Sequence, residues 1–418
     1  MTATPETVAN ILKEHYAGSS YESMLLEDRS SPTYAIMPKR KDWRGSRVPL
    51  PFMYAPSAGV SASFGDAQAA KADASEEKWD MTTKDFFSLF SLDHKAVQQA
   101  KGSENAFIDL VESRANAAIA SFGKFQRKFI FGGGGGSIGE IESGGNGTAS
   151  LVLTERASMH VFDRNLNVTV ALTDGGTDLN DIAVIGNINR QTRTLALLGA
   201  GNWTANYLAG SHIHLRGTVG NAMSGLAGWL PTTAPGATEW YGVNRTLDSR
   251  LYGVIRTINP AIDSNIEEAL INLSADVGDQ GGMPDVVVMN SRALRQLVIQ
   301  LGPSVQRSEM PAMTAKGEHA TIGFQTVRIA VETGHIDIIG DRNCPYGLVY
   351  MLQKSSCVVG SMGEAMGYLD YEDDDSKFVR HNSENAMEAR IGGYSNFAIQ
   401  TPGYNGVMDI TALLVAEA

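Results

Sequence analysis

A glycine-rich stretch at residues 129–147, FIFGGGGGSIGEIESGGNG, has the clearest spacing for chemistry. Residues 134–139 match the G-x-G-x-x-G pattern of dinucleotide-binding loops, in which backbone amides approach a phosphate. Residues 135–139 match the G-x-S-x-G pattern that places a catalytic serine, here Ser137, on a sharp turn. The stretch could therefore bind a phosphate or supply a nucleophile. The elements on either side decide between these chemistries.

The elements around the glycines favour neither chemistry. Both patterns need a strand before the glycines and a helix after them. Here residues 103–130 have apolar side chains at spacings of three and four, which predicts a long amphipathic helix before the glycines. Residues 140–153 indicate a loop and then a strand, and no lysine follows the glycines as a P-loop requires. We interpret the glycines as a helix exit and flexible connector, with a serine hydrolase that uses Ser137 as an alternative.

Two other groups of side chains could be considered as metal sites. His212 and His214 lie two apart on a predicted strand and share one face, but no third ligand accompanies them. An acidic run near the C-terminus lacks the glycine and the terminal glutamate of a calcium loop. We interpret the histidines as a polar strand face and the run as solvated or subunit-facing, and we expect no metal, cofactor or catalytic residue. The run consists of Asp370, Glu372, Asp373, Asp374 and Asp375.

Composition indicates a soluble chain with two or three packed units. The 418 residues are 43% hydrophobic and 19% charged. The net charge of −12 argues against a general nucleic-acid binder, although it is compatible with a protein that encloses nucleic acid. Cys344 and Cys357 are too few for a disulfide framework, so we expect reduced core thiols in a cytoplasmic protein. No signal peptide or run of about 18 apolar residues occurs, and we expect no membrane association.

The first 91 residues predict an arm and a long hairpin. Residues 1–45 combine a short amphipathic helix with a proline-containing segment that lacks periodicity. In residues 46–91, Pro49 and Pro51 exclude a helix and a central sheet position. The hairpin has few large apolar residues, so we infer that its partner surface lies on another chain. A basic cluster joins the two segments, either as a solvated turn or as a docking arm for an acidic neighbour. It contains Lys39, Arg40, Lys41, Arg44 and Arg47.

The rest of the chain alternates between β-rich and mixed segments. Turn signals recur about every ten residues over 148–217, which predicts a small barrel or sandwich. Residues 218–355 predict mixed helices and strands, including a helix that opens with a capping box at Ser264 and Glu267. Residues 356–418 return to strands.

This order of elements resembles the tailed-phage major capsid protein of the Hong Kong 97 fold. RVPLPFMYAPSAGVSASFGDAQ, followed by DFFSLF and the long helix, is similar to the extended loop and spine helix of that family. AMSGLAGWLP (222–231) corresponds to its ISGL-type segment. Residues 266–298 are similar to its axial-domain helix, strand and helix, and residues 331–352 to its late axial hairpin. The similarity covers most of residues 46–405.

The resemblance implies an α+β, Hong Kong 97-like capsid fold with a β-rich insertion. The implied divisions are an N-terminal arm (1–45), an extended loop (46–91), a peripheral domain with the spine helix (92–144), a small β-rich barrel or insertion (145–217), an axial domain (218–355), and a return to the peripheral domain with C-terminal strands (356–418).

The implied function is structural. Copies would assemble into pentamers and hexamers of an icosahedral phage head that encloses double-stranded DNA without sequence-specific binding, with no enzymatic activity. The virion would assemble in the host bacterial cytoplasm with a scaffolding protein, a portal and, as a further option, a decoration protein. The alternative within this fold is an encapsulin-like nanocompartment shell. The residues predicted at contacts between subunits are Lys39, Arg40, Lys41, Arg44, Arg47, Phe64, Lys71, Lys78, Trp79, Asp373, Asp374 and Asp375.

Overall fold

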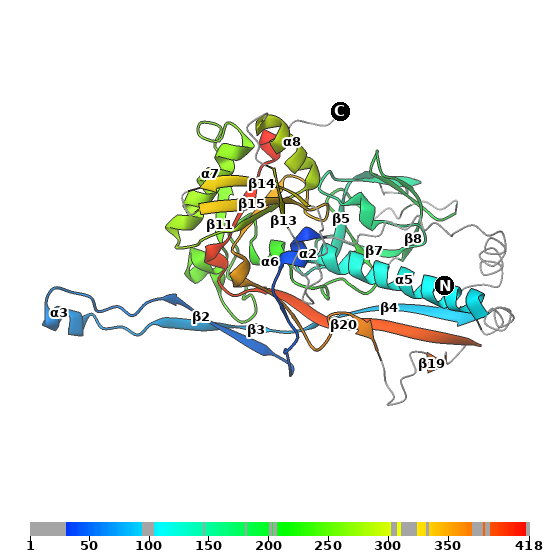
Figure 1. Ribbon diagram of the computed structural model, residues 1–418, viewed down its shortest axis with the longest axis horizontal. Helices are drawn as coiled ribbons and strands as arrows, with labels where there is room; N and C mark the ends of the chain where they lie inside the picture. The colour runs from blue at the N-terminus through cyan, green and yellow to red at the C-terminus, as the bar shows by residue number, and fades with distance from the viewer. Residues whose placement is uncertain are drawn as a thin grey trace.

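The protein is an elongated α+β molecule, which confirms the predicted class (Figure 1). A body made of a helix-covered sheet, a barrel and a long peripheral sheet supports a hairpin that reaches away from it. In this computed structural model the described residues are 31–93, 104–144, 147–179, 182–199, 203, 207–301, 307–310, 324–331, 334–369, 379–380 and 385–414.

The peripheral sheet is built on one long helix, α5 (Glu104–Phe129), which confirms the helix predicted from the apolar spacing. With 26 residues it spans about 40 Å. Its buried Phe122 and Phe129 pack against Phe86, with ring centroids 5.1 and 5.7 Å apart. Phe86 lies on β4 (Lys84–Asp93), which pairs along its whole length with β20. The helix therefore covers one face of a two-stranded ribbon (Figure 1).

The peripheral sheet also joins distant parts of the chain. Its strands are β1 (Lys39–Arg40), β17 (Cys357–Ser361), β20 (Ala386–Ile399) and β18 (Gly367–Tyr368), with β4 and β19 (Val379–Arg380) also paired to β20. The predicted hairpin over 46–91 is therefore too long, because β4 belongs to this sheet. The physical reason is the alternation of Phe86, Phe90 and Leu92, which turns one face of β4 towards α5 and the body.

The segment predicted as the axial domain forms most of a seven-stranded sheet covered by two helices, α7 (Ile266–Asp279) and α8 (Ser291–Leu301). The predicted buried stripe of α7, including Leu270 and Leu273, is confirmed. One strand of the sheet comes from beyond residue 400, so the predicted domain, which ends at residue 355, does not include it. From edge to edge its strands are β11 (Val254–Thr257), β21 (Gly406–Asp409), β16 (Leu348–Leu352), β12 (Val286–Met289), β15 (Gly334–Gly340), β14 (Phe324–Val331) and β13 (Arg307–Met310).

The cap of α7 is one residue later than predicted. The Asn265 side chain, rather than that of Ser264, accepts the hydrogen bond from a first-turn amide, that of Glu268. Glu268 in turn accepts from the Ser264 amide at 3.0 Å. Both serine and asparagine are good caps, and the local sequence offers the same three-residue spacing in two registers. The predicted pair of Ser264 and Glu267 is therefore wrong by one position.

The β-rich segment is a closed barrel, in the order β10-β5-β6-β9-β8-β7. Its interior holds fully buried apolar side chains such as Leu151, Phe162 and Ile213. The barrel begins with β5, eight residues before the predicted border at 145, so its first strand starts directly at the glycine-rich stretch. The strands are β5 (Ser137–Gly144), β6 (Ser150–Leu153), β7 (Asn167–Ala171), β8 (Ala183–Asn189), β9 (Thr194–Leu197) and β10 (His212–Leu215).

Short elements complete the described chain. Among the described helices, none combines the length and the apolar character needed to cross a membrane. The remaining strands, β2 (Val48–Ala55) and β3 (Ser75–Met81), form the hairpin. The short helices are α2 (Pro32–Ile36), α3 (Phe64–Ala69) and α6 (Leu226–Trp229), with 3₁₀ turns at Met159–Val161, Arg245–Leu247, Ser249–Leu251, Lys354–Ser356, Pro402–Tyr404 and Thr411–Leu413.

Candidate assembly surfaces and the serine beside the glycine-rich turn

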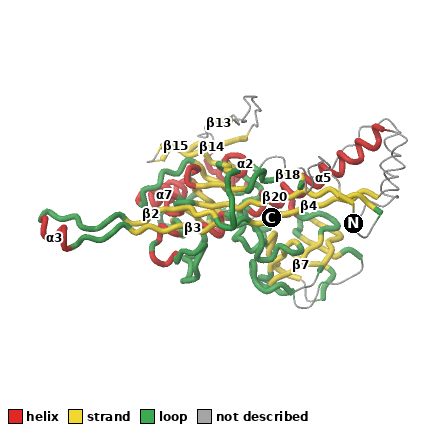
Figure 2. Tube along the Cα trace, turned by 90° about the horizontal axis from the view of Figure 1, so that it is seen from below, coloured by secondary structure: helices red, strands yellow, loops and turns green. Residues whose placement is uncertain are grey.

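The hairpin of β2 and β3 has two parts with different surroundings. Strand pairing runs from Val48 opposite Met81 to Ala55 opposite Ser75. Beyond the paired strands, Val60 is 95% exposed and Phe64 on α3 is 84% exposed. Both views show this outer part clear of the body (Figures 1 and 2). A segment that holds large apolar side chains in solvent is a candidate surface for contact with another chain.

The base of the hairpin is anchored in the body, chiefly by Trp79. This side chain is fully buried, stacks on Phe52 with centroids 4.7 Å apart, and meets the edge of Trp229 at 5.1 Å. Its Nε1 donates a hydrogen bond to the carbonyl of Gln400 at 3.1 Å. The prediction that Trp79 contacts a neighbouring subunit is therefore wrong. The alternating residue pattern predicted that Trp79 lies on a strand. The contact with Trp229, which buries Trp79, arises only when the chain folds.

The basic cluster lies on the surface of its own chain. Lys39 and Arg40 form β1, which pairs in parallel with β17. Trp43 beside them is buried, and it packs so closely on Gly360 that a Cβ there would lie 1.8 Å from the indole. The described part of the predicted arm is therefore docked on this body. The five basic side chains of the cluster remain exposed.

Members of the cluster also have acidic partners within the chain. Lys41 pairs with Glu364 at 2.9 Å, and Arg47 approaches Asp80 at 3.8 Å. These pairs are mostly exposed, and such pairs contribute little to stability. Neither pair prevents a contact with another copy, so the role of the cluster between subunits stays a prediction.

The other predicted contact residues are divided between the hairpin and an undescribed segment. Phe64 lies on α3 at the tip, and Lys71 follows it in an exposed position. Lys78 is exposed on β3 and lies 3.5 Å from Asp80. The hairpin therefore gathers three of these residues near its tip and edge, and their contacts stay predictions. Asp373, Asp374 and Asp375 lie outside the described residues.

The glycine-rich stretch is a tightly packed turn between α5 and β5. Gly134 and Gly136 have φ angles of +90° and +92°, which side chains rarely adopt. A Cβ on Gly135 would lie 2.2 Å from Asp174, and one on Gly136 would lie 2.5 Å from the carbonyl of Thr218. Glycine is therefore required at these positions, because neighbouring segments approach too closely to leave room for a side chain. The expectation of a flexible connector is wrong, because the loops after β7 and β10 close onto this turn.

Folding brings His212 and Asp174 to Ser137, the first residue of β5, and places His214 against Asp174. The Oγ of Ser137 lies 3.0 Å from Nδ1 of His212, and its amide donates to Oδ1 of Asp174 at 2.9 Å. The same Asp174 oxygen lies 3.4 Å from Nε2 of His214. His214 is fully buried and His212 is half-buried, so the expectation of a polar strand face is wrong. Sequence reasoning missed Asp174, which lies in an ordinary TDGGTD turn.

Electrostatics at this cluster keep Asp174 charged and His212 neutral. Burial raises the pKa of Asp174, but hydrogen bonds from His214 and the Ser137 amide outweigh it and hold the pKa below its ordinary value. Burial lowers the pKa of His212, against the attraction of Asp174 and Glu140. Among the described residues, no group of three or more His, Cys, Asp and Glu side chains could hold a metal ion.

The cluster contains the residue types of a serine hydrolase in an arrangement that differs from a nucleophile elbow. The Ser137 amide donates to the carboxylate of Asp174, so this amide is not open to a developing oxyanion. Asp174 orients His214, while the serine contacts His212. Ser137 also continues into a strand rather than a helix. This arrangement can stabilise the junction between the turn and the barrel.

A buried lysine beside this junction makes stability depend on pH. Lys128 donates hydrogen bonds to Oγ of Ser158 at 3.1 Å and the carbonyl of Asn343 at 3.5 Å. Burial lowers the pKa of Lys128 to about 8, against opposing attractions that include Asp341. In the unfolded chain Lys128 keeps its higher ordinary pKa. Between pH 8 and 10 the unfolded chain therefore binds more protons than the folded chain. The free energy of unfolding should therefore rise with pH across this window, by up to about 3 kcal/mol.

Lys128→Met is expected to remove this pH dependence. The substitution deletes the cost of burying a charge but also two hydrogen bonds, so we expect a net gain of about 1–2 kcal/mol at pH 7. Urea unfolding of the unassembled chain at pH 7 to 10 measures both effects. Lys71→Met, on the exposed hairpin tip, is the control and should keep the wild-type profile. If the free energy of unfolding of Lys128→Met still rose with pH as in wild type, the pH dependence would belong to another group.

Comparisons with known proteins identify the fold. No protein-family model and no curated protein matches the sequence. Among solved structures, the capsid asymmetric unit of cyanophage A-1(L) matches with a TM-score of 0.53 and 9% identity, over 98% of each chain. The capsid of the native GTA particle matches at TM-score 0.46 and 7% identity (94% of this chain, 96% of the other). The holo-SrpI encapsulin complex of Synechococcus elongatus PCC 7942 gives 0.45 and 8% (97% and 98%).

These likenesses establish the fold, and the cyanophage capsid chain supplies the argument. At 9% identity, agreement over nearly the full length of both chains reflects a shared backbone architecture. The chain therefore has the Hong Kong 97-like capsid fold, which confirms the resemblance stated from the sequence. In the divisions predicted from that resemblance, β2 and β3 fall in the extended loop, and α5 is the predicted spine helix.

Proposed function

We propose that this chain is the major capsid protein of a tailed phage, which assembles into pentamers and hexamers of an icosahedral head around double-stranded DNA. The observation that carries the proposal is the projecting hairpin on a body with a capsid fold. Its base is anchored through Trp79, while Val60 and Phe64 near its tip are exposed. A shell needs large contacts between copies, and a hairpin that spans to a neighbour supplies them.

Contacts between copies would combine apolar burial with charge pairing. Docking of the tip would remove Phe64 and Val60 from water, each contributing on the order of 2 kcal/mol per copy. The basic cluster from Lys39 to Arg47 would set the orientation of neighbours through complementary charge. A scaffolding protein, a portal and an optional decoration protein are the proposed partners. We place assembly in the host bacterial cytoplasm and the product in the virion.

Assembly of the purified chain tests the shell proposal. The protein is expressed alone and with a candidate scaffolding protein, then examined by size-exclusion chromatography and negative-stain microscopy. Closed shells, or rings of five and six copies, are the expected result. A compact monomer under all of these conditions would overturn the proposal. Nucleic acid in particles isolated from the native host supports a phage head, whereas an enzyme cargo without nucleic acid supports the encapsulin-like alternative.

We propose that the chain has no enzymatic activity and that Ser137 is structural. Wild type should hydrolyse an activated ester no faster than a heat-denatured sample, and Ser137→Ala should not change that rate. The substitution removes the hydrogen bond between Oγ and His212 Nδ1 and the one that Oγ donates to the Gly139 carbonyl, so it should cost about 1–2 kcal/mol of stability. Esterase turnover that the substitution abolishes would contradict the proposal.

A further inference from the structure

A cavity of about 170 Å³ lies beside the glycine-rich turn, where α5 ends. Its walls come from the end of α5 and the turn, from β5 and the segment after β6, and from the start of β16. Arg156 is among the lining residues, and its side chain is 44% exposed, so the cavity reaches the surface. Lys128 also lines it but is only 7% exposed. The cavity is therefore a path from solvent to a buried amine.

The amine of Lys128 contacts neutral oxygens only. It donates to Oγ of Ser158 at 3.1 Å and to the carbonyl of Asn343 at 3.5 Å. Within the part of the chain that the structure describes, no carboxylate lies at ion-pair distance from it; Asp341 and Asp174 act at longer range. A buried charge without a paired carboxylate is unfavourable, so these surroundings favour the uncharged amine.

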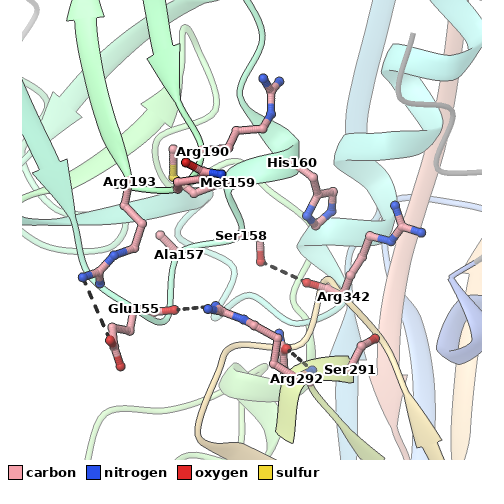
Figure 3. A pocket seen from close by; sticks show the side chains of 12 residues that line it. Glu155, Ala157, Ser158, Met159, His160, Arg190, Arg193, Ser291, Arg292 and Arg342 are labelled. Carbon is pink, nitrogen blue, oxygen red and sulfur yellow. Dashed lines mark hydrogen bonds and ion pairs between the residues drawn. The ribbon is translucent and has the colours of Figure 1, made fainter. Parts of the chain in front are cut away.

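The direction of the hydrogen bonds also suits an uncharged amine. Ser158 connects Lys128 with a neighbouring cavity, and Figure 3 shows its hydroxyl group directed to the carbonyl of Arg342, to which it donates at 3.4 Å. The oxygen of Ser158 is thus the acceptor towards Lys128. Two acceptors take two N–H groups, which is the number in a neutral amine, whereas an ammonium group has three. The third position on the nitrogen is left for a lone pair.

The titration of Lys128 agrees with this geometry. Burial lowers its pKa to about 8, although Cys344, Asp341 and Asp174 act in the opposite direction. At pH 7 the neutral fraction is then about two hundred times that of a lysine with the ordinary pKa of about 10.4. Lysines that are desolvated in this way are nucleophiles towards carbonyl groups.

The other ionisable groups that line the cavity favour a neutral ligand. Glu140 and Asp174 are acidic, whereas Arg156 and Lys128 are basic, so neither sign of charge dominates. His212 also lines the cavity, and burial lowers its pKa against the attraction of Asp174 and Glu140. Much of the remaining wall is apolar and includes Phe131, Ile138 and Leu348. The cavity therefore offers no preference for an anion or a cation.

We propose that Lys128 is a site of covalent modification by small neutral aldehydes, which enter through this cavity and form a Schiff base with the amine. The nitrogen lone pair attacks the carbonyl carbon, and a proton passes from nitrogen to the carbonyl oxygen. A carbon–nitrogen double bond then forms as water leaves, so no oxidant or reductant is needed. The uncharged imine removes the cost of a buried ammonium group.

The size of the cavity limits the aldehyde. About five water molecules would fill 170 Å³, which leaves room for roughly three or four heavy atoms beyond the amine. Acetaldehyde and propanal are of this size. The inference stands apart from the shell proposal, because it concerns a cavity within one chain and a stoichiometric modification.

Reductive trapping on the full-length unassembled chain tests the inference. Acetaldehyde and sodium cyanoborohydride are added at pH 7, and the reductant converts each Schiff base into a stable amine. Peptide mass spectrometry gives the rate at every lysine, with the exposed Lys71 as the internal reference. The bulky 2-naphthaldehyde is the size control. Ala227→Leu narrows the cavity from α6, and circular dichroism melts confirm that this variant is folded.

Acetaldehyde should modify Lys128 at least about tenfold faster than Lys71, and 2-naphthaldehyde should reverse this preference. The rate at Lys128 should level off above about pH 8. In Ala227→Leu the rate at Lys128 should fall at least about fivefold while that at Lys71 is unchanged. A rate at Lys128 no higher than that at Lys71, or modification only in urea, would overturn the inference. So would a preference for Lys128 that 2-naphthaldehyde shares, or an unchanged rate in folded Ala227→Leu.

Discussion

Replacing residues 56–74 by a two-residue Asn-Gly turn is expected to abolish shell assembly while leaving the body folded. Ala55 and Ser75 are direct cross-strand partners, so such a turn can close the shortened hairpin. The deleted segment includes Val60 and α3, which has no buried residue. We expect the free energy of unfolding to change by less than about 1 kcal/mol. Size-exclusion chromatography and microscopy measure assembly, and urea unfolding measures stability.

The deletion needs a control for nonspecific damage. Arg216→Gln, an exposed position on the barrel that is not among the predicted contacts, leaves the hairpin intact and should assemble as wild type. Far-UV circular dichroism should show the same secondary structure in the deletion variant as in wild type, apart from the six residues of α3. Closed shells at wild-type yield from the deletion variant would show that the hairpin is not an assembly element.

Trp79→Ala should have the largest effect on folding. Trp79 is fully buried, stacks on Phe52, meets Trp229 and donates to the Gln400 carbonyl. Removing this side chain leaves a large cavity and an unpaired carbonyl, so we expect a loss of about 3–5 kcal/mol. Chemical unfolding of the unassembled chain measures it. Assembly should fail secondarily, because the base of the hairpin loses its anchor.

Phe64→Ala is the matched control for Trp79→Ala. Both substitutions remove an aromatic side chain from the same hairpin, but Phe64 is 84% exposed. We expect a change in stability within about 0.5 kcal/mol and a reduced yield of shells. Loss of stability in Trp79→Ala and loss of assembly alone in Phe64→Ala would distinguish an anchor within the chain from a contact between chains. If Phe64→Ala destabilised the monomer as much as Trp79→Ala, the division of the hairpin into anchored and projecting parts would be contradicted.

Local patterns were sufficient to predict the main elements. The spacing of Phe122, Phe125 and Phe129 predicts α5, since a helix face repeats every three to four residues. Turn signals that recur about every ten residues predict a small barrel or sandwich, and only the folded chain shows that the strands close into a barrel. The order of these elements also suffices for the capsid-like fold, because the resemblance depends on sequence order rather than on long-range contacts.

The sequence did not predict which distant segments pair with each other as strands. β4 follows the hairpin directly, yet its partner is β20, about 300 residues later. Trp79 had the pattern of an exposed hairpin residue until folding placed Trp229 against it. The border at residue 355 failed because β21, near the C-terminus, completes the axial sheet. Strand partners are chosen by surfaces that exist only in the folded chain.

The sequence by itself determined the long helix, the β-rich segment and the hairpin, because each follows from local periodicity and turn chemistry, and the order of these elements carried the resemblance that implied the capsid fold. Tertiary structure alone decided what the polar groups do. It joined Ser137 to His212 and Asp174 at the start of a strand, whereas a nucleophile elbow continues into a helix. It also placed the amine of Lys128 against neutral oxygens from separate segments, beside a cavity that reaches the surface. Such clusters depend on distances between remote residues, which single-residue spacing does not encode.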